Sequence, residues 1–358
     1  MSSILIVDDN LVNLKQIYAY LSQKHEVSLA KSGKLALQIC EKEQPDLIIL
    51  DVEMPEMDGF ATIAHFKENP NLNHIPIIFM TGNNDAETEV KCLESGAVDF
   101  ISKPVDSEIL HYRIELHLQF SKYQSYLKYT IQELEDNIGI SFAELLDLKD
   151  NYSANQVMRI ISSTELLANK LLEEGAFKNE LTVEYIETLK RAVPFHNIGK
   201  IGISDIIILK RGTLSEIERE EVRRHTTIGC RIIKKIYERT PSQRYLEMAM
   251  LIAEGHHERY DGTGYPNGLK GDDIPLCSRI TALVNVYNST VTTKVYRKAL
   301  THEEACKIII DGRGTEFDPV IADVFLKNKN LFNNFKMDEN LSMINRGWNL
   351  FHEANTGS

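Results

Sequence analysis

Polar side chains follow several short apolar runs in the first third of the chain, each at the point where the run ends. These residues are Asp8, Asp9, Asp51, Thr81 and Lys103. Three carboxylates brought together repel one another unless a cation joins them, and oxygen ligands suit Mg²⁺. Asp51 could then act as a nucleophile toward a phosphoryl group, with Lys103 as a counter-charge and Thr81 as a hydrogen-bond donor. The pattern predicts a phosphoacceptor site that depends on Mg²⁺.

A second set of chemically capable residues consists of histidines in the latter half of the chain. They are His196, His225, His256 and His257. A single histidine is more often an ordinary core or surface residue, but the adjacent pair stands directly before a glycine-rich turn. Clustered imidazoles suit Mn, Fe, Ni or Zn, and two such ions bridged by a carboxylate form a clamp for attack on a phosphodiester.

The elements that position the first set alternate between strands and helices. Five short apolar runs predict strands, at Ile4–Val7, Val27–Ala30, Leu47–Leu50, Ile75–Met80 and Phe100–Ser102. Helical patterns lie between them, so we expect an α/β domain with a doubly wound, five-stranded parallel sheet. Such sheets place their chemistry at the carboxyl ends of the strands. From Tyr152 to about Asn330 no alternating pattern occurs, and this part is expected to be all helix.

The segment from Ser107 to about Lys149 is nearly free of helix breakers. Its apolar residues recur close to a heptad spacing, at Ile109, Leu116, Phe120, Tyr123, Leu127 and Leu134. Arg113 and Thr130 fall on the same seam. Two interpretations stay open: a last helix that packs on its own domain and runs into a linker, or a helix that dimerises and carries a signal between domains.

Composition narrows the function classes. A net charge of −12 argues against binding of DNA through phosphate neutralisation. No apolar run approaches the roughly 20 residues of a spanning helix, so we expect a cytoplasmic protein without membrane insertion. The cysteines are dispersed and are expected to be reduced core thiols; they are Cys40, Cys92, Cys230, Cys277 and Cys306.

The first 120 residues resemble the receiver domain of two-component response regulators. The matching pieces are ILIVDD, LIILDVEMPEMDG, FMTG and DFISKP. The resemblance implies that Asp51 accepts a phosphoryl group from a sensor histidine kinase. It also implies that Asp9, Asp51 and the backbone carbonyl of Glu53 bind Mg²⁺ with help from Asp8, and that Thr81, Phe100 and Lys103 form the switch.

Residues from about 150 to 330 resemble the HD-GYP family of helical metal phosphohydrolases, which hydrolyse cyclic di-GMP. The matching pieces are FHNIGKIGISDIIILKRGTL, HTTIG, HHERYDGTGYPNGLKGDDIP, RITALVNVYNS and GTEFDP. The resemblance implies that His196, His225, His256 and His257 are metal ligands. By position, the resemblance places Lys200 near the reacting water and Lys294 and Arg297 toward the phosphates of the ligand. It makes Gly264, Tyr265 and Pro266 the signature loop.

Several positions depart from the family pattern. Asn197 replaces the bridging aspartate, Asn285 a second metal-binding aspartate, Asn288 a nearby aspartate, and Gln156 the first histidine ligand. Two divalent ions carry four positive charges, and amide oxygens neither neutralise them nor bind them well. Since changes outside the ligand shell already cost ~10–100-fold in affinity or activity, the loss of ligands should cost more. We therefore expect at most one metal, Fe, Mn, Ni or Zn, held mainly by His225, His256 and His257.

The resemblances together divide the chain into segments. We expect a receiver domain over 1–121, a helical linker and candidate dimer helix over 122–150, an HD-GYP-like domain over 151–335 and a terminal helix and tail over 336–358. Three functions remain open. In the first, the output domain binds cyclic di-GMP, a related nucleotide or, through the GYP loop, a protein partner. In the second it is a working phosphodiesterase with a mononuclear or atypical metal site, and in the third the protein is a purely structural homodimer controlled by phosphorylation.

Overall fold

The computed structural model describes residues 1–82, 86–149, 156–210, 212–241, 243–292 and 298–333. The chain forms two compact units, Met1–Gln132 and Glu133–Ser358, which are considered separately below. Within the described ranges, no helix is both long and apolar enough to cross a membrane.

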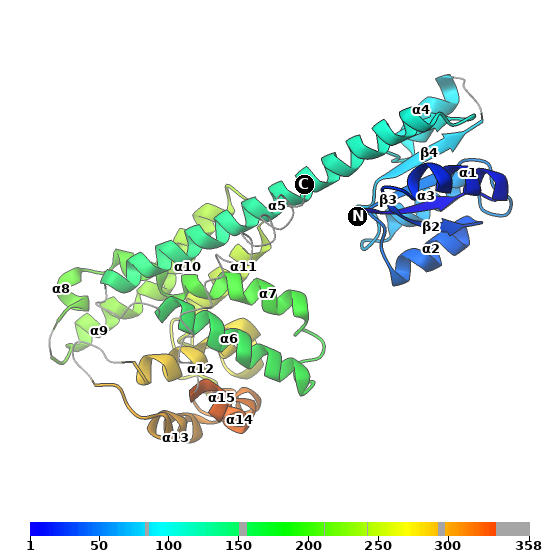
Figure 1. The fold of residues 1–358 in the computed structure, drawn as a ribbon. Helices are drawn as coiled ribbons and strands as arrows, with labels where there is room; N and C mark the ends of the chain where they lie inside the picture. Colours follow the sequence, from blue (N-terminus) through cyan, green and yellow to red (C-terminus); the bar gives the residue numbers. More distant parts are fainter. Residues whose placement is uncertain (83–85, 150–155, 211, 242, 293–297, 334–358) are drawn as a thin grey trace. The chain divides into compact units, whose positions relative to one another are not determined.

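The first unit contains a five-stranded parallel sheet with the strand order β2-β1-β3-β4-β5 (Figure 1). The strands are β1 Ser3–Val7, β2 Glu26–Ala30, β3 Leu47–Asp51, β4 Ile77–Thr81 and β5 Asp99–Ser102. The helices between them are α1 Leu11–Leu21, α2 Gly33–Lys42, α3 Gly59–Glu68 and α4 Ala86–Glu94. The expected doubly wound α/β fold is confirmed.

Each face of this sheet has its own core because side chains alternate along the buried strands. On one face, Leu5 and Leu50 pack with residues of α2, α3 and α4. On the other face, Ile6 and Ile49 pack with residues of α1 and α5. Strands that are apolar on both faces leave their polar residues for the strand ends, where the first predicted site lies.

Helix α5, Ser107–Lys149, is one continuous helix, and the division between the two units falls within it. Leu110, Ile114 and Leu118 bury their side chains in the core of the first unit. Ala143 and Leu146 lie in the core of the second unit. One helix therefore contributes to both cores.

The described part of the second unit is helical, as expected from the sequence. Its longer helices are α6 Gln156–Glu173, α7 Val183–Ala192, α10 His225–Tyr237, α11 Arg244–Gly255, α12 Leu276–Thr290, α13 His302–Gly312 and α14 Pro319–Lys327. The others are the 3₁₀ helices η1 Val193–Gly202 and η2 Gly271–Asp273 and the short α-helices α8 Asp205–Ile208, α9 Glu216–Arg223 and α15 Lys329–Asn333.

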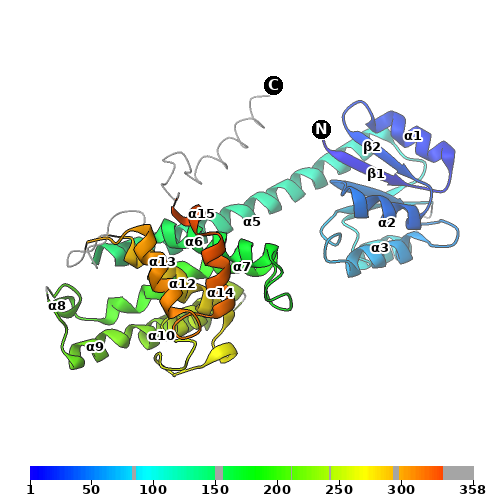
Figure 2. The same ribbon diagram turned by 90° about the horizontal axis from the view of Figure 1, so that it is seen from below.

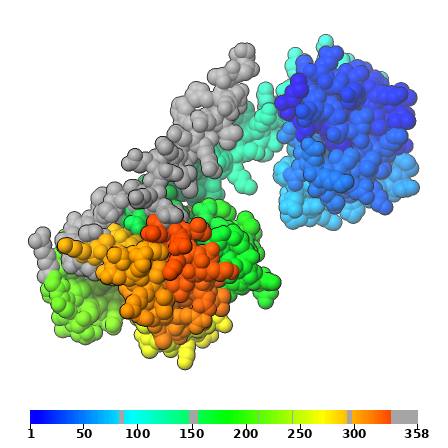
Figure 3. Space-filling view, turned by 60° about the horizontal axis from the view of Figure 1, so that its bottom comes forward, coloured from blue at the N-terminus to red at the C-terminus, as the bar shows by residue number. Residues whose placement is uncertain are grey.

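Helices α12, α13 and α14 pack against one another in this unit (Figure 2). In the space-filling view α13 and α14 form part of the surface of the second unit (Figure 3). The helices that position the histidines, η1, α10 and α11, contact one another extensively. The predicted terminal helix and tail, and also Lys294 and Arg297, lie outside the described residues.

Candidate functional site

The strand ends of the first unit bring Asp8, Asp51 and Lys103 into direct contact. The Lys103 Nζ atom lies 3.0 Å from Asp8 Oδ2 and 2.7 Å from Asp51 Oδ2. Asp8 and Asp51 are almost fully buried. Asp9 is exposed, and its carboxylate lies within 4.8 Å of the ligand atoms of the other two aspartates. This trio could hold a divalent cation through oxygen atoms, the ligand type that Mg²⁺ prefers.

The electrostatics of this site favour a cation. Burial and the neighbouring Asp8 raise the pKa of Asp51 to about 6, although Lys103 and the backbone N–H of Glu53 oppose the rise. Burial alone would lower the pKa of Lys103, but the carboxylates of Asp51 and Asp8 raise it overall. Added positive charge would therefore stabilise the ionised, nucleophilic form of Asp51.

The predicted switch residues lie on the two neighbouring strands at the same end of the sheet. Thr81 is buried at the end of β4, and its register partner on β5 is Ser102. Phe100 is half-buried on β5, with the guanidinium of Arg113 located 5.8 Å from the centre of its ring. The peptide bond between Lys103 and Pro104 is cis.

Sequence reasoning missed Asn13, which positions one of the acidic residues. Its Nδ2 atom donates to Asp8 Oδ2 at 2.9 Å, and the backbone N–H of Asn10 donates to Asp8 Oδ1 at 2.8 Å. Asn13 lies one helical turn beyond the N-cap Asn10 of α1, so its side chain faces back toward the strand end. That spacing is the sequence signal that could have identified it.

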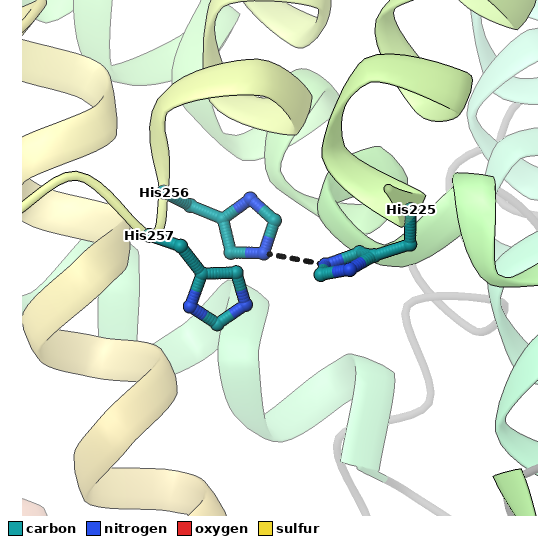
Figure 4. Close-up of side chains that lie close together, drawn as sticks. All are labelled: His225, His256 and His257. Atoms are coloured by element: carbon teal, nitrogen blue, oxygen red, sulfur yellow. Dashed lines mark hydrogen bonds between the residues drawn. The ribbon is translucent and has the colours of Figure 1, made fainter. Parts of the chain in front are cut away.

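In the second unit, three predicted histidines converge in space. His225 begins α10, and His256 and His257 follow the end of α11. One ring nitrogen from each lies within 4.8 Å of the other two. The rings of His225 and His256 point toward one another, with 3.5 Å between their Nε2 atoms (Figure 4). His225 and His256 are buried.

Backbone carbonyls orient two of these rings. His225 Nδ1 lies 2.7 Å from the carbonyl oxygen of Val222, and His256 Nδ1 lies 2.8 Å from that of Ile252. A carbonyl oxygen only accepts hydrogen bonds, so each Nδ1 carries the proton and each Nε2 keeps its lone pair. Burial, together with His257, lowers the pKa of His256 well below its ordinary value, which keeps it neutral. The ring nitrogens of His225, His256 and His257 therefore suit one transition metal as ligands.

His196 lies beside this cluster but has a different partner. Its Nδ1 atom donates to the carbonyl oxygen of Val193 at 3.0 Å, so its Nε2 atom also keeps a lone pair. That lone pair accepts a hydrogen bond from the Asn197 amide at 2.8 Å. Burial and the positive charge of Lys200 lower the pKa of His196 to about 3. The Asn197 amide therefore satisfies the nitrogen that a metal would use.

The residues that depart from the family pattern meet at one small cavity. It has a volume of about 10 Å³, close to the room that one water molecule needs. Its polar lining consists of Gln156, His196, Asn197, Asn285 and Asn288. Among the described residues, Gln156 Oε1 and Asn288 Nδ2 are buried without a hydrogen-bond partner. The described residues of this lining include no carboxylate, so they do not fit a divalent ion.

Close packing of η1 against α10 brings the two histidine regions together. A Cβ atom at Gly199 would lie 1.8 Å from the carbonyl oxygen of His225 and 2.5 Å from the backbone nitrogen of Gly229. Only glycine allows this approach of the two backbones. Gly199 therefore fixes the position of His225 relative to His196.

The loop Gly264-Tyr265-Pro266 borders the three-histidine cluster. The Tyr265 ring stacks on His257, with 4.8 Å between the ring centres and 17° between the planes. A Cβ atom at Gly264 would lie 2.2 Å from the backbone nitrogen of Arg259, so this position also requires glycine. The peptide bond before Pro266 is cis.

Sequence reasoning also missed Glu258, which holds this loop from within. Its buried carboxylate accepts hydrogen bonds from the backbone N–H groups of Asn267 at 2.7 Å and Leu269 at 3.1 Å. A buried carboxylate needs such donors, and here the donors are the backbone of the loop itself. Its place directly after His257 is the one signal that could have indicated it.

Comparison with protein families identifies both units. Residues 4–115 match the response regulator receiver domain, and residues 142–321 match the HD domain. A probable cyclic di-GMP phosphodiesterase of Vibrio cholerae is 38% identical, over 90% of this chain and 77% of that protein.

Two further relatives extend over most of both chains. The cyclic di-GMP phosphodiesterase response regulator RpfG of Xanthomonas campestris is 31% identical, over 91% of this chain and 88% of its own. A cyclic di-GMP phosphodiesterase of Thermotoga maritima is also 31% identical, over 91% and 90% respectively. The chain therefore belongs to the response regulators that join a receiver domain to an HD domain of the cyclic di-GMP phosphodiesterase family.

Proposed function

We propose that this protein is a response regulator, phosphorylated on Asp51 by a sensor histidine kinase, whose output domain binds rather than hydrolyses its ligand. The ligand would be cyclic di-GMP, a related nucleotide or a protein partner at the GYP loop. The observation that carries the proposal is the amide-lined cavity, where Asn197 hydrogen-bonds to the nitrogen of His196 that a metal would use. We assign the receiver to 1–121, the linker to 122–150, the output domain to 151–335 and the tail to 336–358.

The receiver would use Mg²⁺ held by Asp8, Asp9, Asp51 and the backbone carbonyl of Glu53. Contact of Lys103 with both buried aspartates supports its role as the residue that pairs with the phosphoryl group. Thr81 and Phe100 would report phosphorylation to the rest of the chain through β4 and β5.

The output domain would hold one transition metal, Fe, Mn, Ni or Zn, through His225, His256 and His257. A single metal can polarise a water molecule, but it cannot hold both the attacking and the leaving oxygen as a metal pair does. Lys200, Lys294 and Arg297 would contribute positive charge toward phosphates, and Tyr265 would form part of the ligand site.

A phosphodiesterase with one metal is the alternative, and the convergence of the three histidines favours it. Both functions are tested on the full-length protein loaded with Mn²⁺ or Fe²⁺. We expect saturable binding of cyclic di-GMP by calorimetry and little or no product in a hydrolysis assay. Robust turnover together with two transition metals per chain would refute the binding-only function.

A companion variant tests the assignment of the missing ligands. The triple change Gln156→His, Asn197→Asp and Asn285→Asp replaces two amides by carboxylates and adds an imidazole at the cavity. We expect this variant to bind a second transition metal, measured by elemental analysis. If the count stays at one in a folded triple variant, the assignment of these three positions to the second metal is wrong.

A further inference from the structure

Helix α5 exposes a long stripe of large apolar side chains. It comprises Ile109, Tyr112, Leu116, Phe120, Tyr123, Leu127, Ile131, Leu134, Ile138, Phe142 and Leu145. Each of these side chains is between 48% and 79% exposed. Large apolar patches of this kind on a protein surface mark interaction sites. We call this set the α5 stripe.

The α5 stripe repeats every eleven residues. Ile109, Phe120, Ile131 and Phe142 form one such column, and each is followed three residues later by Tyr112, Tyr123, Leu134 and Leu145. Leu116, Leu127 and Ile138 complete the three full repeats. An eleven-residue repeat has about 3.67 residues per turn, close to an undistorted helix, so the stripe stays on one side over its whole length.

This period corrects the heptad spacing inferred from the sequence. A heptad seam would include Arg113 and Thr130, which are polar. In the eleven-residue repeat both residues flank the stripe, and none of its members is charged. The stripe also uses other positions than Leu110 and Ala143, through which α5 enters the cores of the two units.

We propose that the α5 stripe is a dimerisation surface, and that its occupant is the same stripe of a second copy of this chain. From Ile109 to Leu145 the helix is about 55 Å long at 1.5 Å per residue. Only a partner with a straight apolar stripe of similar length covers it fully, and an identical helix meets that requirement.

The area of the stripe is sufficient for a stable dimer. Eleven large side chains that are about half exposed or more present on the order of 1,000 Å² of apolar surface per copy. Two copies would bury on the order of 2,000 Å², which lies at or above the ~1,600 Å² of a standard specific interface.

The residues that flank the stripe are compatible with an identical partner. Gln119, Gln124, Thr130 and Ser141 carry no charge, so they do not repel their equivalents. Two charged residues on the flank are paired within their own units: Arg113 with Asp99, and Glu135 with Arg191 at 3.0 Å. A self-interface places equal charges near each other, and this flank avoids that cost.

The test is the mass of the full-length protein in solution. Sedimentation equilibrium at micromolar concentration should give twice the 40.8 kDa of one chain. The double variant Phe120→Glu, Leu127→Glu should raise the dimer dissociation constant at least ~100-fold, because it places four carboxylates in an apolar interface. The matched control is Tyr126→Glu, Tyr129→Glu on the same helix, where both tyrosines are exposed outside the stripe. This control should remain dimeric.

A cysteine at the midpoint tests the contact itself. Leu127 lies eighteen residues from each end of the stripe, so it faces its equivalent in a parallel or an antiparallel pair. Leu127→Cys should form an intermolecular disulfide on mild oxidation, whereas Tyr126→Cys and the natural sequence should not. A monomeric natural protein, or a double charge variant that is folded and still dimeric, would overturn the proposal. Asp51 labelling and circular dichroism show that the variants are folded.

Discussion

The change Asn197→Asp tests the amide-lined cavity most specifically, because the two side chains have nearly the same shape. In the natural protein the Asn197 amide donates a hydrogen bond to His196 Nε2 at 2.8 Å. An aspartate at this position presents a lone pair and a negative charge to the lone pair of the ring. Without a metal, the native hydrogen bond becomes a repulsive contact.

The magnitude follows from the two parts of this change. Loss of the hydrogen bond costs about 1 kcal/mol, and a poorly paired carboxylate in a partly buried site costs about 1–3 kcal/mol more. We therefore expect the free energy of unfolding of the second unit to fall by ~2–4 kcal/mol in the presence of a chelator. For a unit of this size the melting temperature falls by ~2–4 °C per kcal/mol, which gives a decrease of roughly 5–15 °C.

Calorimetric melting with EDTA and then with excess Mn²⁺ measures this effect. Mn²⁺ should restore most of the lost stability in Asn197→Asp, since the carboxylate then faces a cation instead of a lone pair. The exposed Asn179→Asp is the matched control and should melt like the natural protein under both conditions. The reasoning is refuted if Asn197→Asp melts within about 1 °C of the natural protein in EDTA and gains nothing from Mn²⁺.

Three further predictions concern single contacts. Asp51→Asn should abolish labelling by acetyl phosphate. Because the pKa of Asp51 in the folded protein, about 6, exceeds the ordinary 3.8, the free energy of unfolding of the natural first unit should fall by up to ~3 kcal/mol as the pH rises from 3.8 to 6. This pH dependence should be absent from the variant. Gly199→Ala should destabilise the second unit by about 3 kcal/mol in urea unfolding, since its Cβ would lie 1.8 Å from the His225 carbonyl oxygen; unchanged stability would contradict the close packing. Glu258→Gln should cost about 1–3 kcal/mol and speed hydrogen exchange of the backbone N–H groups of Asn267 and Leu269, whereas slow exchange at both would disprove its role.

The fold of the first unit could be predicted from the sequence because its signals are local. Apolar runs such as Leu47–Leu50 are too short for buried helices, and each ends in a polar residue. Parallel pairing then places Asp8, Asp51 and Lys103 at one edge, where the structure brings them into contact. The spacing of Asn13 from the N-cap Asn10 places it one turn into α1, but its contact with Asp8 also depends on the angle at which α1 leaves the strand end.

The second unit was harder to predict in detail because its geometry depends on contacts between distant helices. The spacing of the histidines gave no distance between His225 and His256. The carbonyls that orient their rings belong to Val222 and Ile252, which are ordinary apolar residues in the sequence. The role of Glu258 depends on the path of the loop, which brings the backbone N–H groups of Asn267 and Leu269 to its carboxylate.

The period of the apolar residues in α5 was also difficult to assign from the sequence alone. Over few turns a repeat of seven and a repeat of eleven coincide at several positions, such as Leu116, Tyr123 and Leu127. The exposed fractions of the side chains distinguish them, because Ile131, Ile138 and Phe142 continue the eleven-residue repeat and fall outside the heptad seam.

The transition-metal content of the natural, full-length protein tests the central claim most directly. The protein is loaded with Mn²⁺, Fe²⁺ or Zn²⁺, freed of excess metal, and measured by elemental analysis beside the variant His225→Ala, His256→Ala. We predict one transition metal per chain in the natural protein and none in the variant. Two metals per chain in the natural protein would contradict the claim that the amide-lined cavity has replaced half of a two-metal site.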